Sequence, residues 1–229
     1  MKRDVRLTLF LGVLVLTLLV LGGVYTYQKN SATPDRLLET YGMAEADSIL
    51  PNGDTVSIPK AHTVGAFRFT DQTGHTVTEA DFAGKVYVAD FFFTTCESIC
   101  IPMGKSIMQL ARQFKGEPRV RFLSHTVDPE TDSVPVLAAY ARLHEADPTQ
   151  WHLVTGPKKA LYDMARYQYY VTAMQGDGGP DDFVHTQNFV LVDARRRIRG
   201  YYDGTQPEEM EKLRKDITIL LQEIPNMGE

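Results

Sequence analysis

The chain has 229 residues, which is enough for one domain with additional segments. It carries 24 lysines and arginines against 29 aspartates and glutamates, a net charge of −5 at pH 7. This balance argues against a nucleic-acid partner, because proteins that bind nucleic acids usually present a basic face. The densest basic cluster, Arg195–Arg197 with Arg199, falls in an expected hairpin turn, where we expect it to be solvated.

The N-terminal segment predicts a membrane anchor. Leu7–Tyr25 is a run of 19 uncharged and mainly apolar residues, and a transmembrane helix needs roughly 20. Three basic residues precede this run, so the positive-inside rule places the N-terminus in the cytoplasm. A cleaved signal peptide is the alternative, but its apolar core is about 7–15 residues long and an A-x-A-like site normally follows. We therefore expect a cytoplasmic stub at 1–6 and a single span at 7–27 in a bacterial inner membrane, with the rest of the chain on the periplasmic side.

The region after the anchor is expected to contain a linker and then one domain. Residues 28–60 have little periodicity and predict a linker with a short helix at 35–41. The domain is expected to span 61–229 and to begin with a hairpin at 67–77, where apolar and polar residues alternate. The nearly continuous apolar run at 86–93 is typical of a central strand that is buried on both faces.

Strands and helices then alternate along the chain. The apolar residues of 100–114 recur at helical spacing, so Met103 and Met108 are expected to pack rather than to bind a metal. Further strands are expected at 119–127 and 151–156, and a short strand or extended piece at 169–174. Further helices are expected at 133–146 (Ser133 as N-cap), 157–167 and 208–221, with a Gly-rich loop at 175–182 and a hairpin from Asn188 to Gly204. This alternation predicts a sheet with parallel strands and both faces covered. With a cysteine motif at a strand-to-helix junction, the order resembles the thioredoxin fold: an α/β domain whose mixed central sheet is flanked by helices, with an extra N-terminal hairpin.

The only two cysteines, Cys96 and Cys100, are separated by three residues in "FFFTTCESICIPM". A purely structural disulfide would add little stability, because loop-closure entropy shrinks with the length of the closed loop. If the turn is helical, the two Cβ atoms lie about 5–6 Å apart, which is wider than a disulfide prefers. Two thiolates that converge on one metal ion are an easier geometry. A helix N-terminus favours thiolates, and soft thiolates select Cu(I) and also hold zinc.

A third ligand would complete such a site, and imidazole suits copper in both oxidation states. Of the six histidines, two are expected to be solvated, one lies in the linker and one alternates with strand residues: His144 and His75, His62, and His152. Two remain. His125 stands at the carboxyl end of a strand, where open α/β sheets form their sites, and His185 stands between the Gly-rich loop and the last hairpin. The pattern does not choose between them.

The order of four landmarks, "DFFFTTCESIC", "VDPETD", "WHLVTG" and "VHTQNFVLVD", resembles the Sco/SenC family of membrane-anchored copper-delivery proteins from about Thr63 to Leu221. The resemblance implies a thioredoxin-like fold and one copper ion bound by the two cysteines and one distant histidine. It also implies a role in the assembly of the copper A centre in subunit II of cytochrome c oxidase, as copper donor or as reductant of its cysteines.

Residue by residue, the resemblance implies that Cys96, Cys100 and His185 are the copper ligands, rather than His125. It places Asp128 in the family's "DP" loop, where we expect it to shape the site as a cap or turn residue. The chain also departs from the family. Pro commonly follows each motif cysteine and Asp often precedes the histidine, whereas this chain has Glu97, Ile101 and Val184 at those positions.

The main alternative is a metal-independent thiol–disulfide oxidoreductase that reduces the cysteines of a target protein. Such reductases resemble one another in a C-x2-C motif and in a Pro opposite it at the start of the penultimate strand. This chain has C-x3-C instead, and no Pro between 183 and 193. The sequence therefore favours a copper chaperone over an enzyme. Its expected partners are the copper A site of subunit II and a copper donor or thiol reductant.

Overall fold

The computed structural model describes residues 14, 15, 17, 18, 20, 38–49, 55–172, 184 and 186–224, and only the backbone of 43–49 and 55–61. The chain divides into two units, 1–37 and 38–229. In the first unit, the five described residues are helical and lie within the predicted span at 7–27. Across the described residues, no helix is both long and apolar enough to cross a membrane. The rest of that span lies outside the described residues, so the anchor stays a prediction.

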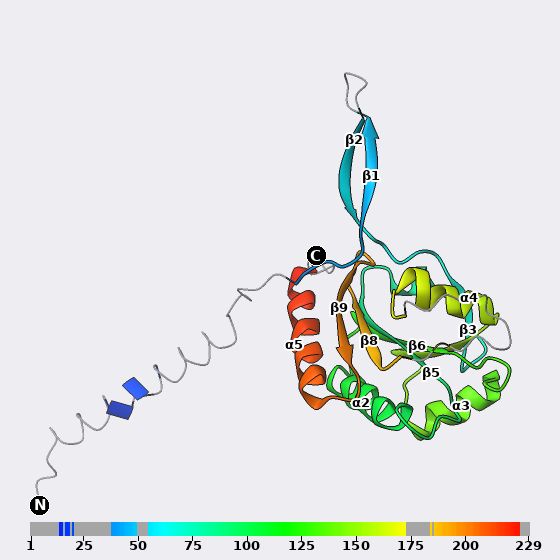
Figure 1. Cartoon of the computed structure of the whole chain (residues 1–229). Coiled ribbons are helices and arrows are strands. Elements are labelled where there is room, and N and C mark those ends of the chain that lie inside the picture. The colour runs from blue at the N-terminus through cyan, green and yellow to red at the C-terminus, as the bar shows by residue number, and fades with distance from the viewer. Residues whose placement is uncertain are drawn as a thin grey trace, which may run out of the picture. The chain divides into compact units, whose positions relative to one another are not determined.

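The second unit is built on a seven-stranded mixed sheet (Figure 1). Its strands are β3 (Arg68–Asp71), β4 (Thr76–Thr78), β5 (Val86–Phe92), β6 (Val120–Thr126), β7 (Trp151–Thr155), β8 (Asn188–Val192) and β9 (Ile198–Asp203), in the spatial order β4-β3-β7-β6-β5-β8-β9. β5, β6 and β7 pair in parallel and the other pairs are antiparallel. The structure thus confirms a thioredoxin-like α/β fold, with β5 in the interior of the sheet and buried at all seven residues.

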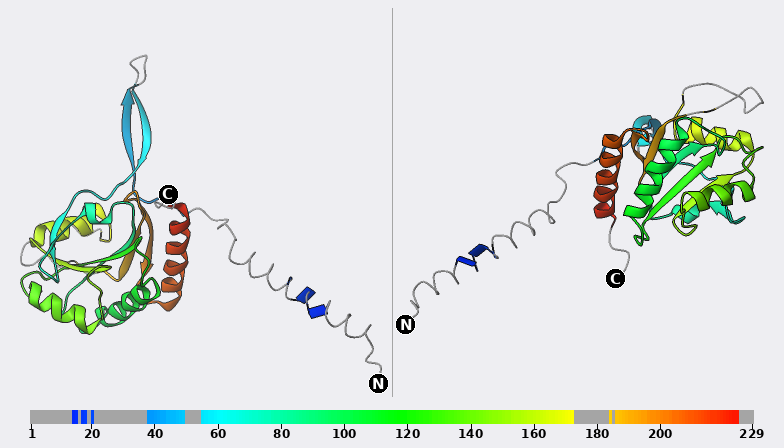
Figure 2. Two further views of the ribbon diagram at one scale, coloured as in Figure 1. Left: turned by 180° about the vertical axis from the view of Figure 1, so that it is seen from behind. Right: turned by 90° about the horizontal axis from the view of Figure 1, so that it is seen from below.

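Helices cover both faces of this sheet (Figures 1 and 2). They are η1 (Glu79–Phe82), α2 (Cys100–Gln113), α3 (Val134–Leu143), α4 (Lys158–Asp163), the π-helix η2 (Met164–Gln168) and α5 (Pro207–Glu223). Because side chains alternate between the faces of a strand, the domain has two core clusters. The first core cluster joins α2, α3 and α5 to one face through residues that include Val88, Phe92, Cys100, Met103, Ile107, Leu137, Trp151 and Ile217. The second core cluster joins α4 and η2 to the other face through residues that include Phe69, Tyr87, Phe91, Leu123, Leu161, Tyr169, Val184 and Val190.

Three expectations about local structure were wrong. The stretch expected to be a linker contains two antiparallel strands, β1 (Met43–Ile49) and β2 (Thr55–Ala61), which form a hairpin (Figure 1). Ala, Glu, Asp and Pro are uncommon in strands, which hides this hairpin, although the dipeptide Asn52–Gly53 between the strands is a strong hairpin signal. Residues 38–41 are not helical. Residues 169–172 are not a strand, and Tyr169 (φ −101°, ψ −12°) and Tyr170 (φ 52°) are not extended either. The remainders of those two predicted elements lie outside the described residues.

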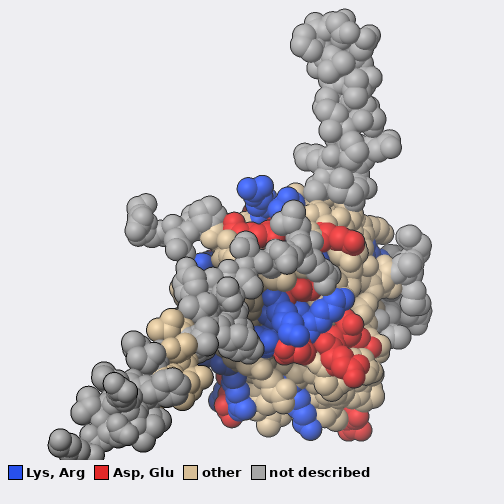
Figure 3. Space-filling view, turned by 90° about the vertical axis from the view of Figure 1, so that its left-hand side faces the viewer, with Lys and Arg blue, Asp and Glu red and all other residues tan. Residues whose placement is uncertain are grey.

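The basic cluster near the last hairpin is also less solvated than expected. Arg195 is exposed in the turn, but Arg199 is buried, and its Nη1 lies 3.0 Å from both Asp193 Oδ2 and Glu223 Oε2. Its Nη2 donates to the carbonyl oxygen of Leu38 at 2.9 Å, so this guanidinium joins the start of the domain to the end of α5. On the face that carries α5, acidic and basic side chains are interspersed (Figure 3). The described part of that helix therefore offers no patch of a single sign for a nucleic acid.

Candidate metal site

Both cysteines lie where β5 gives way to α2. After β5 ends at Phe92, the chain turns, with the Cys96 N–H donating to the Phe93 carbonyl oxygen at 3.3 Å, and α2 begins at Cys100. Both residues are free thiols. Cys96 is half-buried, whereas Cys100 is only 5% exposed and belongs to the first core cluster. The predicted position at a strand-to-helix junction is confirmed.

The two thiols differ in acidity. Burial tends to raise the pKa of Cys96, but hydrogen bonds from the Cys100 thiol and from backbone N–H groups outweigh it, and the pKa is lowered. Burial raises the pKa of Cys100 to about 12, and the hydrogen bond that its thiol donates to Cys96 adds to this increase. Cys96 is therefore the more acidic thiol of the pair, and Cys100 the less acidic one.

A buried carboxylate holds the loop in front of the cysteines. Asp132 is fully buried and accepts hydrogen bonds from the hydroxyls of Thr94 and Thr126, each at 2.5 Å. It thereby joins the loop after β5, two residues before Cys96, to the loop after β6. We expected Asp128 to shape the site as a cap or turn residue. Its carbonyl oxygen accepts hydrogen bonds from the N–H groups of Thr131 and Asp132, at 3.2 and 2.8 Å, and its N–H donates to Thr126 Oγ1 at 3.0 Å, so it has the expected turn role. Sequence reasoning missed Asp132, although it closes the same "VDPETD" motif.

A second buried carboxyl group lies below the site, on the face of the sheet that carries the cysteines. Asp90 on β5 is 4% exposed and accepts a hydrogen bond from Ser124 Oγ at 2.5 Å, and this hydroxyl in turn accepts one from Trp151 Nε1 at 2.8 Å. Burial raises the pKa of Asp90 to about 7, although the hydrogen bond from Ser124 opposes the increase. Sequence reasoning missed this residue because it interrupts an apolar strand without belonging to a motif.

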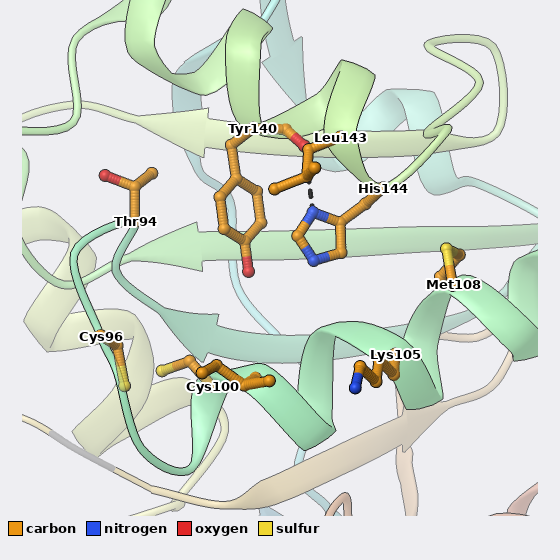
Figure 4. Close-up of a pocket in the computed structure, with 9 residues that line it drawn as sticks. Thr94, Cys96, Cys100, Lys105, Met108, Tyr140, Leu143 and His144 are labelled. Atoms are coloured by element: carbon orange, nitrogen blue, oxygen red, sulfur yellow. Dashed lines mark hydrogen bonds between the residues drawn. The ribbon is translucent and has the colours of Figure 1, made fainter.

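The thiols open into a cleft between α2 and α3 (Figure 4). Its volume is about 380 Å³, and its lining residues are Thr94, Cys96, Cys100, Ile101, Lys105, Met108, Tyr140, Leu143 and His144. In Figure 4 the side chains of Cys96 and Cys100 approach each other at one end, and the rings of Tyr140 and His144 descend from α3. The cleft is a consequence of packing between two helices, which no pattern within either helix reveals.

The described histidines are placed as follows. His125, expected as a possible ligand, is fully buried, and its ring stacks on Phe91 with centroids 4.8 Å apart. Phe91 belongs to the second core cluster, so His125 lies on the face of the sheet opposite the cysteines. His62 Nε2 lies 2.9 Å from the Gln168 carbonyl oxygen. His152 Nδ1 lies 3.2 Å from Asp71 Oδ2, and His75 is exposed, as expected.

One further expectation about a histidine was wrong. His144 is not on a solvated helix face but is half-buried, and it stacks on Tyr140 with ring centroids 4.2 Å apart. Its Nδ1 lies 3.1 Å from the Tyr140 carbonyl oxygen and therefore carries the proton, which leaves the lone pair on Nε2. A Cβ atom at Gly104 would lie only 2.6 Å from that Nε2, so the ring rests against the backbone of α2.

The predicted ligand set is only partly visible. Cys96 and Cys100 lie together, but His185 lies outside the described residues. Within the described part of the chain, no three His, Cys, Asp or Glu side chains are grouped closely enough to hold a metal ion. Of the positions that depart from the family pattern, Glu97 is exposed, Ile101 is 49% exposed and Val184 is 2% exposed.

Comparison with known proteins gives a consistent result. The family model described as SCO1/SenC matches residues 55–222. A SCO1 protein homologue of Bacillus subtilis (strain 168) is 28% identical over 166 residues, which cover 72% of this chain and 86% of the relative. The structure of a SCO1/SenC family lipoprotein from Bacillus anthracis str. Ames is 28% identical with a TM-score of 0.62, and the match covers 70% of this chain and 96% of that one.

Two further solved structures are similar. BsSco, described as a member of the Sco family of cytochrome c oxidase assembly proteins with a disulfide switch, is 29% identical with a TM-score of 0.59, and the match covers 71% of this chain and 95% of that one. The structure of Bradyrhizobium japonicum ScoI with copper bound has a TM-score of 0.56, and the match covers 70% of this chain and 99% of that one. At 22% identity, this last similarity concerns the fold.

Proposed function

The chain belongs to the SCO1/SenC family, and from this premise we propose that it is a copper chaperone. It binds one copper ion through Cys96, Cys100 and His185 and delivers it to the copper A centre in subunit II of cytochrome c oxidase. The observation that carries the proposal is the pair of free thiols that meets at the N-terminus of α2. Copper in a ScoI structure and the assembly role of the Sco family support the same conclusion.

The chemistry of the thiol pair suits this cargo. Thiolates are soft ligands that prefer Cu(I), and a helix N-terminus stabilises their negative charge. The Cys100 thiol, whose pKa is about 12, must lose its proton when the metal binds. We therefore expect copper affinity to rise with pH. The apolar surroundings of Cys100 in the first core cluster would keep water from the metal on one side.

The placement of the described histidines supports His185 as the third ligand. His125 is on the opposite face of the sheet, and His62 and His152 are hydrogen-bonded to residues away from the thiols. His144 shares the cleft, but its Nε2 rests against the backbone of Gly104. None of these histidines therefore takes the place of the third ligand, which leaves His185 of the "VHTQNFVLVD" motif for this role. The predicted anchor at 7–27 would hold the site on the periplasmic side of the inner membrane.

A second function, thiol–disulfide exchange, is favoured by the unequal exposure and acidity of the two thiols. The Cys96 thiolate would attack one sulfur of a target disulfide and release the other target sulfur as a thiolate. The Cys100 thiolate would then attack the Cys96 sulfur, which releases the target as a dithiol and leaves a disulfide between Cys96 and Cys100. The disulfide switch described for BsSco supports this chemistry. A reductase of this kind needs no metal.

Metal stoichiometry separates the two functions. The reduced piece from Ser31 onward is titrated anaerobically with Cu(I) and with Cu(II), beside the variants His185→Ala, His125→Ala and His144→Ala. We expect one copper ion per chain, a site weakened by His185→Ala, and no change with His125→Ala. Loss of binding in His144→Ala, with binding unchanged in His185→Ala, would identify His144 in the cleft as the third ligand. No copper above background, with thiols that still cycle in redox buffers, would leave only the reductase.

A further inference from the structure

The cleft beside the cysteines has an exposed apolar rim that metal binding does not require. Leu143 is 76% exposed and Ile101 is 49% exposed, and both line the cleft. Single exposed apolar residues are common on protein surfaces, but a group of them around a hollow marks an interaction site. Met108, a flexible side chain that adapts to different partners, lines the same cleft. The rim therefore suits an apolar segment of another protein.

The charge of the cleft selects among such segments. Among the described residues that line the cleft, Lys105 on α2 is the only Lys, Arg, Asp or Glu, although the whole chain has a net charge of −5. Lys105 is exposed and forms no ion pair with any other residue that the structure describes. A cation that lacks a partner at the edge of an apolar hollow favours an acidic side chain in whatever binds there.

The walls of the cleft are fixed before anything binds. The Tyr140 ring packs against Phe92, with centroids 5.0 Å apart, and against His144 on its other side, with centroids 4.2 Å apart. A Cβ atom at Gly104 would meet His144 Nε2 at 2.6 Å and Tyr140 Oη at 3.2 Å, so glycine allows α3 to approach α2 this closely. A surface that is already ordered loses little entropy when a partner binds.

We propose that this cleft is the docking site for a cysteine-bearing segment of the partner protein, with apolar and acidic side chains next to the cysteine. The apolar side chain would cover Ile101 and Leu143, and the acidic one would pair with Lys105. The partner's cysteine would then reach Cys96, the more exposed of the two thiols at the end of the cleft. This inference rests on the proposed function of the same site and adds to it the chemistry by which the partner is recognised.

The test is a competition between peptide thiols for Cys96. The full chain carrying Cys100→Ser is purified in a mild detergent and mixed with short peptides whose single cysteine is activated as a disulfide with thionitrobenzoate. The Cys96 thiolate attacks the peptide sulfur, a disulfide forms between them, and thionitrobenzoate leaves as a coloured thiolate that reports the rate. Three peptides share a leucine next to the cysteine and differ in a flanking pair of residues, which is glutamate, lysine or serine.

We expect the glutamate peptide to react about fivefold faster than the serine peptide and the lysine peptide to react slowest, since an exposed ion pair contributes up to about 1 kcal/mol. Lys105→Glu should reverse the order of the glutamate and lysine peptides. Leu143→Ser should slow all three peptides but not a small neutral disulfide. Lys115→Glu, in the turn just after α2, and Tyr167→Ser, an exposed apolar residue outside the cleft, are the matched controls and should change neither ratio.

Equal rates for the three peptides would overturn the proposal. An order that Lys115→Glu reverses as well as Lys105→Glu does would also overturn it, because the preference would then come from the overall charge. Copper stoichiometry is measured separately on the parent chain with both cysteines. A parent that binds copper but does not discriminate among peptides refutes docking alone, and one that discriminates without binding copper refutes the copper function alone.

Discussion

The substitution His125→Phe should change the stability of the domain little at pH 7 and should stabilise it increasingly as the pH falls. The His125 ring is fully buried, with Phe91 stacked on it and the edges of Phe69 and Tyr169 around it, at centroid distances of 5.7 and 5.5 Å. Its Nδ1 donates to the Asp90 carbonyl oxygen at 3.3 Å, but Nε2 has no hydrogen-bond partner among the residues that the structure describes. A phenyl ring would fill this site and remove the unpaired Nε2, at the cost of the hydrogen bond to the Asp90 carbonyl oxygen.

Burial lowers the pKa of His125 from 6.5 to about 4. Because the folded pKa lies below the unfolded one, the unfolded chain binds more protons between these values. The stability due to neutral His125 is therefore present above pH 6.5 and is lost as the pH falls towards 4. A shift of about 2.5 units corresponds to about 3 kcal/mol, since each unit is about 1.4 kcal/mol. At pH 7 we expect the variant to lie within about 1 kcal/mol of the parent, because the unpaired Nε2 and the tighter fit of Phe offset each other.

Urea unfolding of the reduced domain at pH 7, 5.5 and 4 measures this difference directly. Subtracting the parent from the variant at each pH removes the contributions of all other titrating groups. His75→Phe is the control, because His75 is exposed in a turn and should give a difference that does not vary with pH. The reasoning would be refuted if the difference between His125→Phe and the parent were the same at pH 7 and at pH 4.

Two predictions concern the buried carboxyl groups near the thiols. The pKa of Asp90 is about 7 instead of 3.8, so its contribution to stability is present at low pH and is lost as the pH rises through 7. Asp90→Asn should therefore stabilise the domain more at pH 8 than at pH 5, by at most about 3 kcal/mol in urea unfolding, and an equal effect at both would contradict this. Asp132→Ala should destabilise the domain by about 3 kcal/mol, because it leaves the buried groups that bond Asp132 unpaired. In the same assay Asp128→Ala should cost less than about 0.5 kcal/mol, and equal losses would place the loop contact elsewhere.

Local patterns were sufficient to predict most elements of the domain, and the reason differs between elements. The strand β5 is buried at every residue, so the apolar run in its sequence directly indicates a position in the interior of the sheet. Helix α2 buries Met103, Ile107 and Leu110, and this helical spacing was visible in the sequence. The β1–β2 hairpin was not predicted, because Ala, Glu, Asp and Pro interrupt the pattern of its strands and only Asn52–Gly53 gives a clear hairpin signal.

The thiol pair was predictable for a similar reason, whereas its surroundings were not. Cys96 and Cys100 are close in the chain, so their spacing alone brings them together. Asp132 contacts Thr94 from 38 residues away, and His144 reaches the cleft only because α3 packs on α2 at Gly104. Contacts of this kind depend on the packing of whole elements. His144 was accordingly given the wrong role, although the helix before it was placed correctly. The turn role of Asp128 is local and was predicted from the motif.

The unequal burial of the two thiols bears on how copper would leave the site. Transfer between proteins by ligand exchange needs one bound ligand that is accessible enough for an incoming thiolate to displace it, while the other ligands remain bound to the metal. Cys100 is fixed in the first core cluster at the start of α2, whereas Cys96 stands half-exposed on the loop that Asp132 holds through Thr94. An incoming thiolate would therefore approach the metal from the Cys96 side, and Cys100 would be the last protein ligand to dissociate. The same order, Cys96 first and Cys100 second, is the one that thiol–disulfide exchange requires, so one asymmetry in packing serves both proposed reactions.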